Sequence, residues 1–250
     1  MKRMALTRLA LAGAMMAGLA TSAVADGMDR SGSIKDAPVA AAPFSWKGHY
    51  FGAHIGVART EVDVNDIAYN GGNGFSHDAS TAFGGVQFGV NWQSGSVVGG
   101  IEVDLGYLGA NSRGQFPGFV GDPTRIGDSI AGINGGPYAV LAARLGFAAG
   151  RTLFYAKAGF AFASLEASYV DPNPTGAVLT SGTHNRELAS GFAVGGGIEH
   201  AISDKWTIKG EYLFMDFGTN SHTAFVGAAP VPFSHDIEVH TFKIGLNYKF

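Results

Sequence analysis

The last twelve residues, "VHTFKIGLNYKF" at 239–250, alternate between polar and apolar side chains. The phase that contains Phe242, Ile244 and Leu246 is apolar, whereas the opposite phase contains Lys243. Alternation with a period of two predicts a strand with two unlike faces. A water-soluble barrel would turn the apolar face inward, and a membrane barrel would turn it outward towards lipid. The rest of the sequence must decide between these two surroundings.

Eight segments share this pattern and predict strands of about ten to twelve residues, near the length that a tilted strand needs to cross a bilayer. The strands are expected at 49–58, 82–92, 97–108, 138–147, 152–163, 189–200, 206–217 and 240–250. The connections alternate between long and short, so that all long loops fall on one rim; the long ones are 59–81, 109–137, 164–188 and 218–239. Outer-membrane barrels have this asymmetry, with short periplasmic turns and long outward loops.

The predicted fold class is all-β: an eight-stranded antiparallel up-and-down transmembrane β-barrel with both termini on the periplasmic side. A composition of 38 Gly and 12% aromatic residues fits strands and turns better than helices. The sequence contains no Cys, which removes disulfides and thiol-based catalytic or metal sites together. A closed sheet would supply the rigidity of an exported chain that has no disulfides.

A balanced set of charged residues, four acids and four bases, falls in the polar phase of the strands, and Asp216 is an exception on the apolar phase at a strand end. If this phase faced lipid, each Lys or Arg near the midplane would cost roughly 2–4 kcal/mol. We therefore predict that it faces the lumen and forms an interior charge network, with neighbouring glycines making room; its members are Glu102, Asp104, Arg144, Lys157, Glu199, Lys209, Glu211 and Lys243.

Aromatic residues gather at the periplasmic ends of the predicted strands, where a membrane interface would lie. We predict Trp46, Trp92, Trp206 and Tyr248 as interface aromatics. A lipocalin-like soluble barrel would show the same alternation of polar and apolar residues, but it has no reason to collect Trp at one end. The pattern favours the membrane barrel.

The N-terminal segment has the features of a secretory signal: Lys2 and Arg3, an apolar stretch at 9–19, and "AVA" before Asp26. The predicted organisation is a signal peptide at 1–25, a flexible periplasmic linker at 26–45 and the barrel at 46–250. The formal charge of −3 becomes more negative when the signal is removed, which argues against nucleic acid as a partner. The expected location is the outer membrane.

Three segments together carry a family likeness: "FSWKGHYFGAHIG" at 44–56, the terminal "LNYKF" and the signal peptide. The chain resembles the small outer-membrane surface-antigen β-barrels of alphaproteobacteria, porin-family-like proteins that are similar to the eight-stranded barrel of OmpA-type proteins. The resemblance implies outer-membrane lipid and lipopolysaccharide as surroundings. It also implies that Phe250 is the signal read by the outer-membrane assembly machinery, and that the protein is a structural or surface-interaction protein.

No catalytic, cofactor-binding or metal site is predicted. The Gly-rich stretch at 191–200 lacks the Lys-Ser/Thr of a phosphate loop, and no Ser-His-acid grouping appears. We therefore expect a non-enzymatic structural barrel whose four long loops act in envelope integrity and in surface or host interaction, with an unknown loop partner.

Two other functions stay open at this point. A narrow, porin-like channel would use the charged interior, although eight strands leave a lumen that side chains just fill. A hemin-binding surface protein would use histidines in the long loops, namely His77, His184, His222 and His235.

Overall fold

The computed structural model describes residues 44–66, 74–109, 111–115, 130–172, 178–183, 187–226 and 229–250. The predicted signal peptide and the predicted linker up to residue 43 lie outside the described residues, so both stay predictions. The part of the chain that the structure describes contains no helical segment that would span a bilayer.

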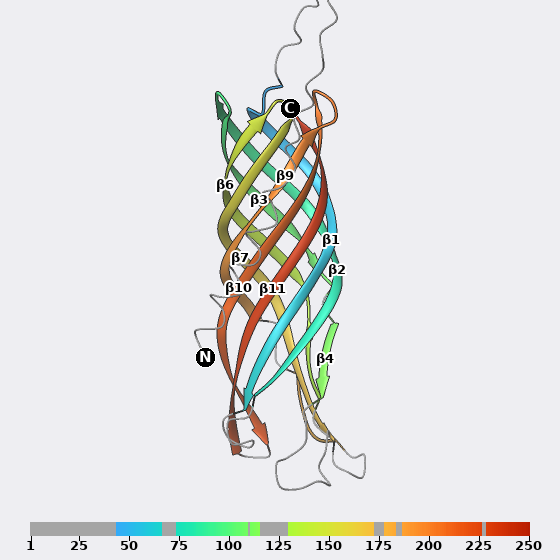
Figure 1. Ribbon diagram of the computed structural model, residues 1–250. Helices are drawn as coiled ribbons and strands as arrows, with labels where there is room; N and C mark the ends of the chain where they lie inside the picture. The colour runs from blue at the N-terminus through green and yellow to red at the C-terminus, as the bar shows by residue number, and fades with distance from the viewer. Residues whose placement is uncertain are drawn as a thin grey trace, which may run out of the picture. The chain divides into compact units, whose positions relative to one another are not determined.

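Eight strands form a closed antiparallel ring in which the last strand pairs with the first (Figure 1). The ring confirms the predicted eight-stranded all-β barrel. Its members, in order around the barrel, are β1 (Gly48–Asp66), β2 (Gly74–Ser94), β3 (Val97–Leu108), β6 (Pro137–Ala149), β7 (Thr152–Pro172), β9 (Glu187–Ala201), β10 (Trp206–Val226) and β11 (Ala229–Lys249).

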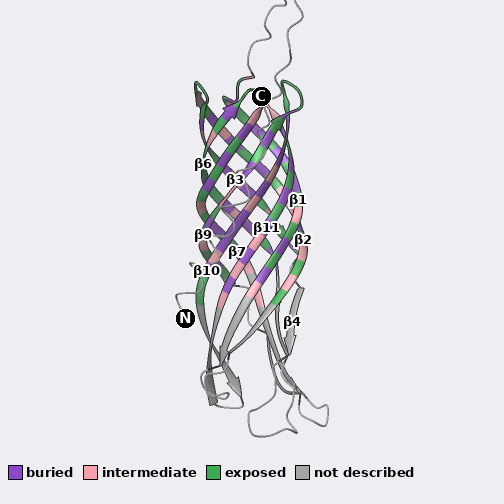
Figure 2. Cartoon of the chain, viewed as in Figure 1, coloured by how far each residue is buried: buried purple, intermediate pink, exposed green. Residues whose placement is uncertain are grey.

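Burial alternates along each strand and shows which phase lies inside (Figure 2). On β3, the inward Glu102 and Asp104 are 0% and 1% exposed, whereas the outward Ile101 and Leu105 are 46% and 49% exposed. A barrel with a charged interior and a bare apolar exterior cannot be stable in water, because the apolar surface would stay hydrated. The soluble lipocalin-like alternative is thereby excluded.

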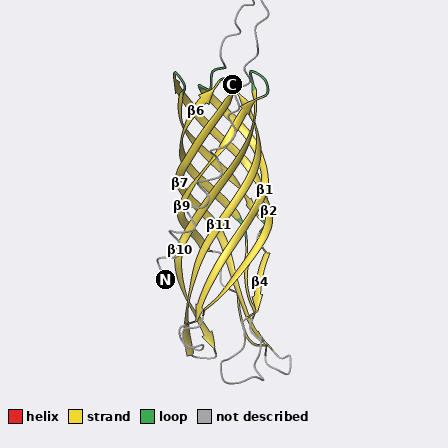
Figure 3. Ribbon diagram, viewed as in Figure 1, coloured by secondary structure: helices red, strands yellow, loops and turns green. Residues whose placement is uncertain are grey.

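The strands are longer than predicted on the rim opposite the short turns (Figure 3). β1 continues to Asp66, and β10 and β11 extend to Val226 and from Ala229. The predicted long loops 59–81 and 218–239 are therefore wrong as loops, since most of their residues are strand. Backbone hydrogen bonds need no apolar side chains, so pairing continues where the apolar phase has ended.

The other two predicted long loops contain short strands that were not expected. β4 (Asn111–Gln115) and β5 (Ile130–Asn134) lie within 109–137, and β8 (Val178–Thr183) lies within 164–188. Both β5 and β8 pair with the extended part of β7, and β4 pairs with β5. These segments lengthen the sheet beyond the barrel wall.

The three short turns lie at the rim where the chain ends. Gly95 and Gly150 adopt φ values of 59° and 60°, which suits the tight reversals after β2 and β6. In the third turn, the Ser203 hydroxyl oxygen accepts hydrogen bonds from the backbone N–H groups of Lys205 and Trp206. The Lys249 N–H donates to the Lys205 carbonyl at 2.7 Å, so the C-terminus lies beside this turn.

The close packing inside the wall gives a first prediction. A Cβ added at the inward Gly159 would overlap the Leu141 carbonyl oxygen, whereas one added at Gly99 would have no atom within 4 Å. We expect Gly159→Ala to lower the free energy of unfolding by about 1–3 kcal/mol, and Gly99→Ala to leave it nearly unchanged. Urea unfolding in lipid vesicles measures both, and equal stabilities of the two variants would contradict this account.

Candidate functional site

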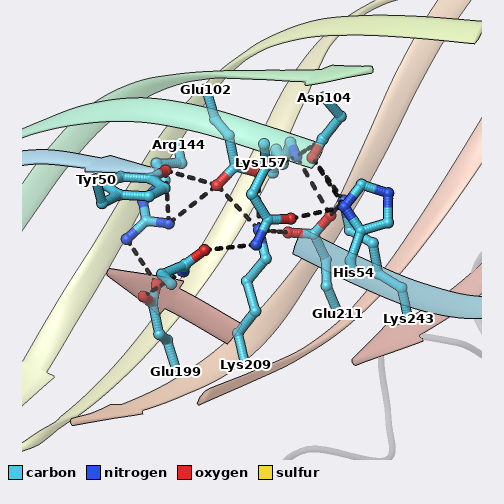
Figure 4. A network of polar contacts seen from close by, with 12 residues as sticks. Tyr50, His54, Glu102, Asp104, Arg144, Lys157, Glu199, Lys209, Glu211 and Lys243 are labelled. Carbon is cyan, nitrogen blue, oxygen red and sulfur yellow. Dashed lines mark hydrogen bonds and ion pairs between the residues drawn. The ribbon is translucent and has the colours of Figure 1, made fainter. Parts of the chain in front are cut away.

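The eight charged residues predicted for the lumen all lie inside the barrel, and none is more than 3% exposed. They come from six strands around the ring and form one connected group of ion pairs (Figure 4). We call this group the lumen network. Its members are Glu102, Asp104, Arg144, Lys157, Glu199, Lys209, Glu211 and Lys243.

Three ammonium groups and three carboxylates interleave at the centre of the lumen network. Lys157 Nζ lies 2.5 Å from Glu102, 2.5 Å from Asp104 and 3.2 Å from Glu211. Lys243 Nζ lies 2.9 Å from both Asp104 and Glu211. The three carboxylate groups lie within 4.8 Å of one another, which would suit a cation. The lysines already neutralise them, so this arrangement is an ion-pair cluster.

One pair crosses the whole lumen. Lys209 on β10 donates to both carboxylate oxygens of Glu102 on β3, at 3.0 Å each. In the ring, β3 and β10 are separated by β6, β7 and β9 on one side and by β2, β1 and β11 on the other. They are therefore opposite walls, and the side chains join them directly.

Arg144 forms the part of the network that lies nearer the short turns. Its Nη2 is 2.9 Å from Glu199, and its Nη1 donates to the Tyr50 hydroxyl at 3.1 Å. The guanidinium also lies over the rings of Tyr50 and Tyr155, 5.1 and 4.8 Å from the centroids. Glu199 in turn accepts hydrogen bonds from Thr207 at 2.5 Å and from Asn247 at 2.9 Å. Arg144 is therefore held by charge, hydrogen bonds and ring contacts.

Sequence reasoning missed the uncharged polar groups that complete the network. Tyr50 donates to Glu102 at 2.5 Å, and Tyr155 donates to Glu211 at 2.8 Å. His54 joins two further strands, because its ring nitrogens lie 2.9 Å from Gln87 and 2.6 Å from the Tyr138 hydroxyl. These five residues are Tyr50, His54, Gln87, Tyr138 and Tyr155, and all stand in the inward phase of their strands. Their place in that phase would have predicted that they face the lumen.

Trp46 is not an interface aromatic, and this prediction is wrong. Its side chain is 2% exposed and belongs to a buried cluster with Leu153 and Tyr155 inside the barrel. The Phe44 ring packs against it at 4.9 Å, and the backbone N–H of Trp46 donates to Gln93 Oε1 at 2.7 Å. Trp46 precedes β1, so the alternation of the strand does not apply to it. Gly48, with a φ of 130°, provides the backbone conformation between this segment and β1.

We call Phe44 and Trp46 the aromatic plug. Its other neighbours in the cluster are Val98, Ala148 and Ala201, which end or begin β3, β6 and β9 at the rim of the short turns. The Arg151 guanidinium and the Lys249 ammonium lie 5.4 and 4.9 Å from the Phe44 ring centroid. The plug thus lies in the lumen between the network and this rim.

The other predicted aromatics lie on the outside. Trp92 and Trp206 are 52% and 41% exposed, and the Trp206 ring contacts the Tyr248 ring edge-on at 5.1 Å. Phe250 is also exposed, and its backbone N–H donates to the His49 carbonyl at 3.0 Å. Their roles at the lipid interface and in assembly stay predictions.

Three of the four histidines expected in long loops lie in strands. His77, His222 and His235 fall within β2, β10 and β11, and His184 lies outside the described residues. The placement of these three histidines in loops is therefore wrong, whereas a hemin site that uses them stays a prediction. The strands run on through the predicted loops, as described above.

These observations define the class: a membrane-spanning β-barrel with an apolar exterior and a charged interior, as found in bacterial outer membranes. The family model "Outer membrane protein beta-barrel domain" matches residues 12–250. The chain belongs to this family, and it is an outer-membrane protein.

Relatives from alphaproteobacteria are similar along almost the whole chain. The 31 kDa outer-membrane immunogenic protein of Brucella melitensis is 30% identical, over 92% of this chain and 95% of the relative. The 22 kDa outer membrane protein of Rhizobium leguminosarum is 28% identical, over 86% of this chain and 83% of the relative. The predicted resemblance to small outer-membrane barrels of this group is confirmed.

Among solved structures, the outer membrane protein OprG from Pseudomonas aeruginosa aligns with a TM-score of 0.47 and 10% identity. The alignment covers 82% of this chain and 96% of that one.

Removing one charge tests the lumen network. Replacement of Lys157 by Met leaves Glu102 and Asp104 with fewer buried partners, and loss of one member of a buried ion pair costs about 3–5 kcal/mol. We expect Lys157→Met to lower the free energy of unfolding by that amount. The exposed Lys47 provides the control, since Lys47→Met should change it by less than about 0.5 kcal/mol.

The double variant Lys157→Met/Glu102→Gln separates pairing from loss of bulk. We expect it to be less destabilised than the sum of the single variants, because both charges leave together. Strict additivity in urea unfolding would show that the two side chains do not act as a pair.

Proposed function

We propose that this outer-membrane protein is a structural component of the envelope that acts through its outward rim, and that its lumen is not a route for solutes. The observation that supports the proposal is the lumen itself, which is filled by ion pairs and by the aromatic plug. An eight-stranded barrel has an interior just wide enough for side chains. Here those side chains bond to one another.

The links across the lumen support a closed, rigid barrel. The Lys209–Glu102 pair connects opposite walls, and His54 on β1 bonds with Tyr138 on β6. A solute would have to separate these groups, and each charge set free in the lumen would lose its partner. The aromatic plug adds a second, apolar layer nearer the short turns.

The outward rim is the surface left for interaction. The strands project beyond the apolar exterior, and their outward side chains there include Glu61, Asp78 and Glu238. The Brucella relative carries the name immunogenic protein. We extend surface exposure to this chain, with lipid and lipopolysaccharide around the barrel and a further, unknown partner at the rim.

Conductance distinguishes this proposal from a channel. We expect refolded wild-type protein to give no steady conductance above background in planar bilayers, because the lumen network and the plug both occlude the lumen. Lys47→Met serves as the matched control for Lys157→Met. A steady wild-type conductance that changes with Lys157→Met or Glu102→Gln would favour the narrow channel instead.

Shortening the outward rim tests whether the barrel has the structural role in the envelope and the rim is the exposed surface. In the variant, a two-residue turn joins β10 to β11 in place of residues 219–236. This removes the outer ends of both strands and keeps the parts that carry Lys209, Glu211 and Lys243. We expect this variant to restore detergent resistance to a deletion strain as well as the wild type does. We also expect whole-cell labelling by antibodies raised against the folded protein to fall at least tenfold.

Two results would contradict this picture. A deletion strain as resistant to detergent as its parent would argue against a structural role in the envelope. Undiminished antibody labelling of the shortened variant would show that the rim is not the exposed surface.

A further inference from the structure

A second group of ionisable side chains lies on the outside of the barrel, where the apolar exterior ends on the side away from the short turns. Glu61 on β1 and Glu238 on β11 are directly opposite each other in the ladder, and His240 lies two residues further along β11. One ligand atom from each of the three residues lies within 4.8 Å of the others. All three side chains are partly exposed. We call this group the seam site, because it lies where the first and last strands meet.

The register forces like charges together at the seam. Directly opposed like charges destabilise a sheet. The row extends to both neighbours, since Asp78 on β2 is opposite Glu61 and Asp216 on β10 is opposite Glu238. Four carboxylates thus follow one another across four adjacent strands.

Three carboxylates of this row contact an arginine or a backbone N–H group. Arg59 Nη2 is 3.1 Å from Asp78, and its Nε is 3.5 Å from Glu61. Asp216 accepts a hydrogen bond from the Gly218 N–H at 2.7 Å. Arg59 is shared between two carboxylates on the β1–β2 side.

The histidine of the seam site is oriented as metal ligands usually are. The Tyr212 hydroxyl lies 2.7 Å from His240 Nδ1, and the Phe214 ring packs 5.0 Å from the imidazole. Histidines that bind metals commonly use the second ring nitrogen for a partner that fixes tautomer and orientation. A ring held through Nδ1 presents Nε2 as the ligand atom. Tyr212 is therefore suited to act as a positioning residue.

We propose that Glu61, Glu238 and His240 bind a divalent transition-metal ion of the zinc class. One imidazole and two carboxylates supply the nitrogen and oxygen donors that zinc accepts, with a fourth position open. Magnesium and calcium prefer all-oxygen sites, so the histidine distinguishes the seam site from a merely acidic surface. The bound cation is coordinated by the opposed glutamates and links β1 to β11. The inference does not depend on whether the lumen conducts.

Zinc titration of the full mature protein in detergent micelles, in competition with a chromophoric zinc indicator, tests the site. We expect one tight equivalent of zinc, with affinity at least tenfold lower in His240→Ala and in Glu238→Gln. Tyr212→Phe should lower affinity by about tenfold, as for other partners of metal ligands. The matched control is His200→Ala, which should bind like the wild type. His200 is also an outward histidine with a hydroxyl neighbour, Thr152 at 3.0 Å, but it lies at the other rim.

Two further measurements keep the test decisive. β-sheet circular dichroism identifies any variant that has not folded, and Glu61→Gln then serves as a second variant of the same site. Cobalt bound in place of zinc should give a visible absorption band that His240→Ala abolishes. The proposal is overturned if His240→Ala and Glu238→Gln bind zinc within twofold of the wild type, which would place the metal on other histidines. It is equally overturned if magnesium or calcium displaces zinc at comparable concentrations.

Discussion

The structure depends on one constraint: the exterior of the barrel must be apolar, so the charged side chains lie inside. The ion pair between Lys209 and Glu102 follows from this constraint and joins opposite walls of the barrel. Lipid around the barrel requires one phase of every strand to be apolar, and the other phase then collects the polar side chains inside. A charge in a narrow lumen has little water to solvate it, so it needs a partner. Pairing across the lumen is the consequence.

Such a network is a costly way to stabilise a protein in water, because desolvation offsets much of the attraction between buried charges. Here the network mainly constrains the relative positions of the strands. Arg144 contacts Glu199, Tyr50 and Tyr155 at once. The wall strands are thereby fixed in register by contacts through the lumen as well as by the ladder.

The alternation of residues was sufficient to predict the ring of eight strands and the inward phase of residues such as Lys157. The alternation was insufficient beyond the apolar exterior, where no phase of a strand has to be apolar. β1 runs to Asp66, and β8 exists, because backbone pairing continues without an apolar phase. Trp46 was misplaced because it precedes the strand, where residue type suggests an interface but only tertiary packing decides. Tyr50 and Gln87 were overlooked because the prediction weighed formal charge and left neutral polar groups aside.

The position of Trp46 bears on how the barrel assembles. The residues that bury it lie on β3, β6, β7 and β9, which are synthesised after it and none of which pairs with β1. Its pocket therefore exists only when those strands have come together, whereas Trp92 and Trp206, which we predict to lie at the lipid interface, are exposed on the outside of the wall. Tryptophan emission from this chain consequently reports two separate events, entry into the bilayer and completion of the circular wall.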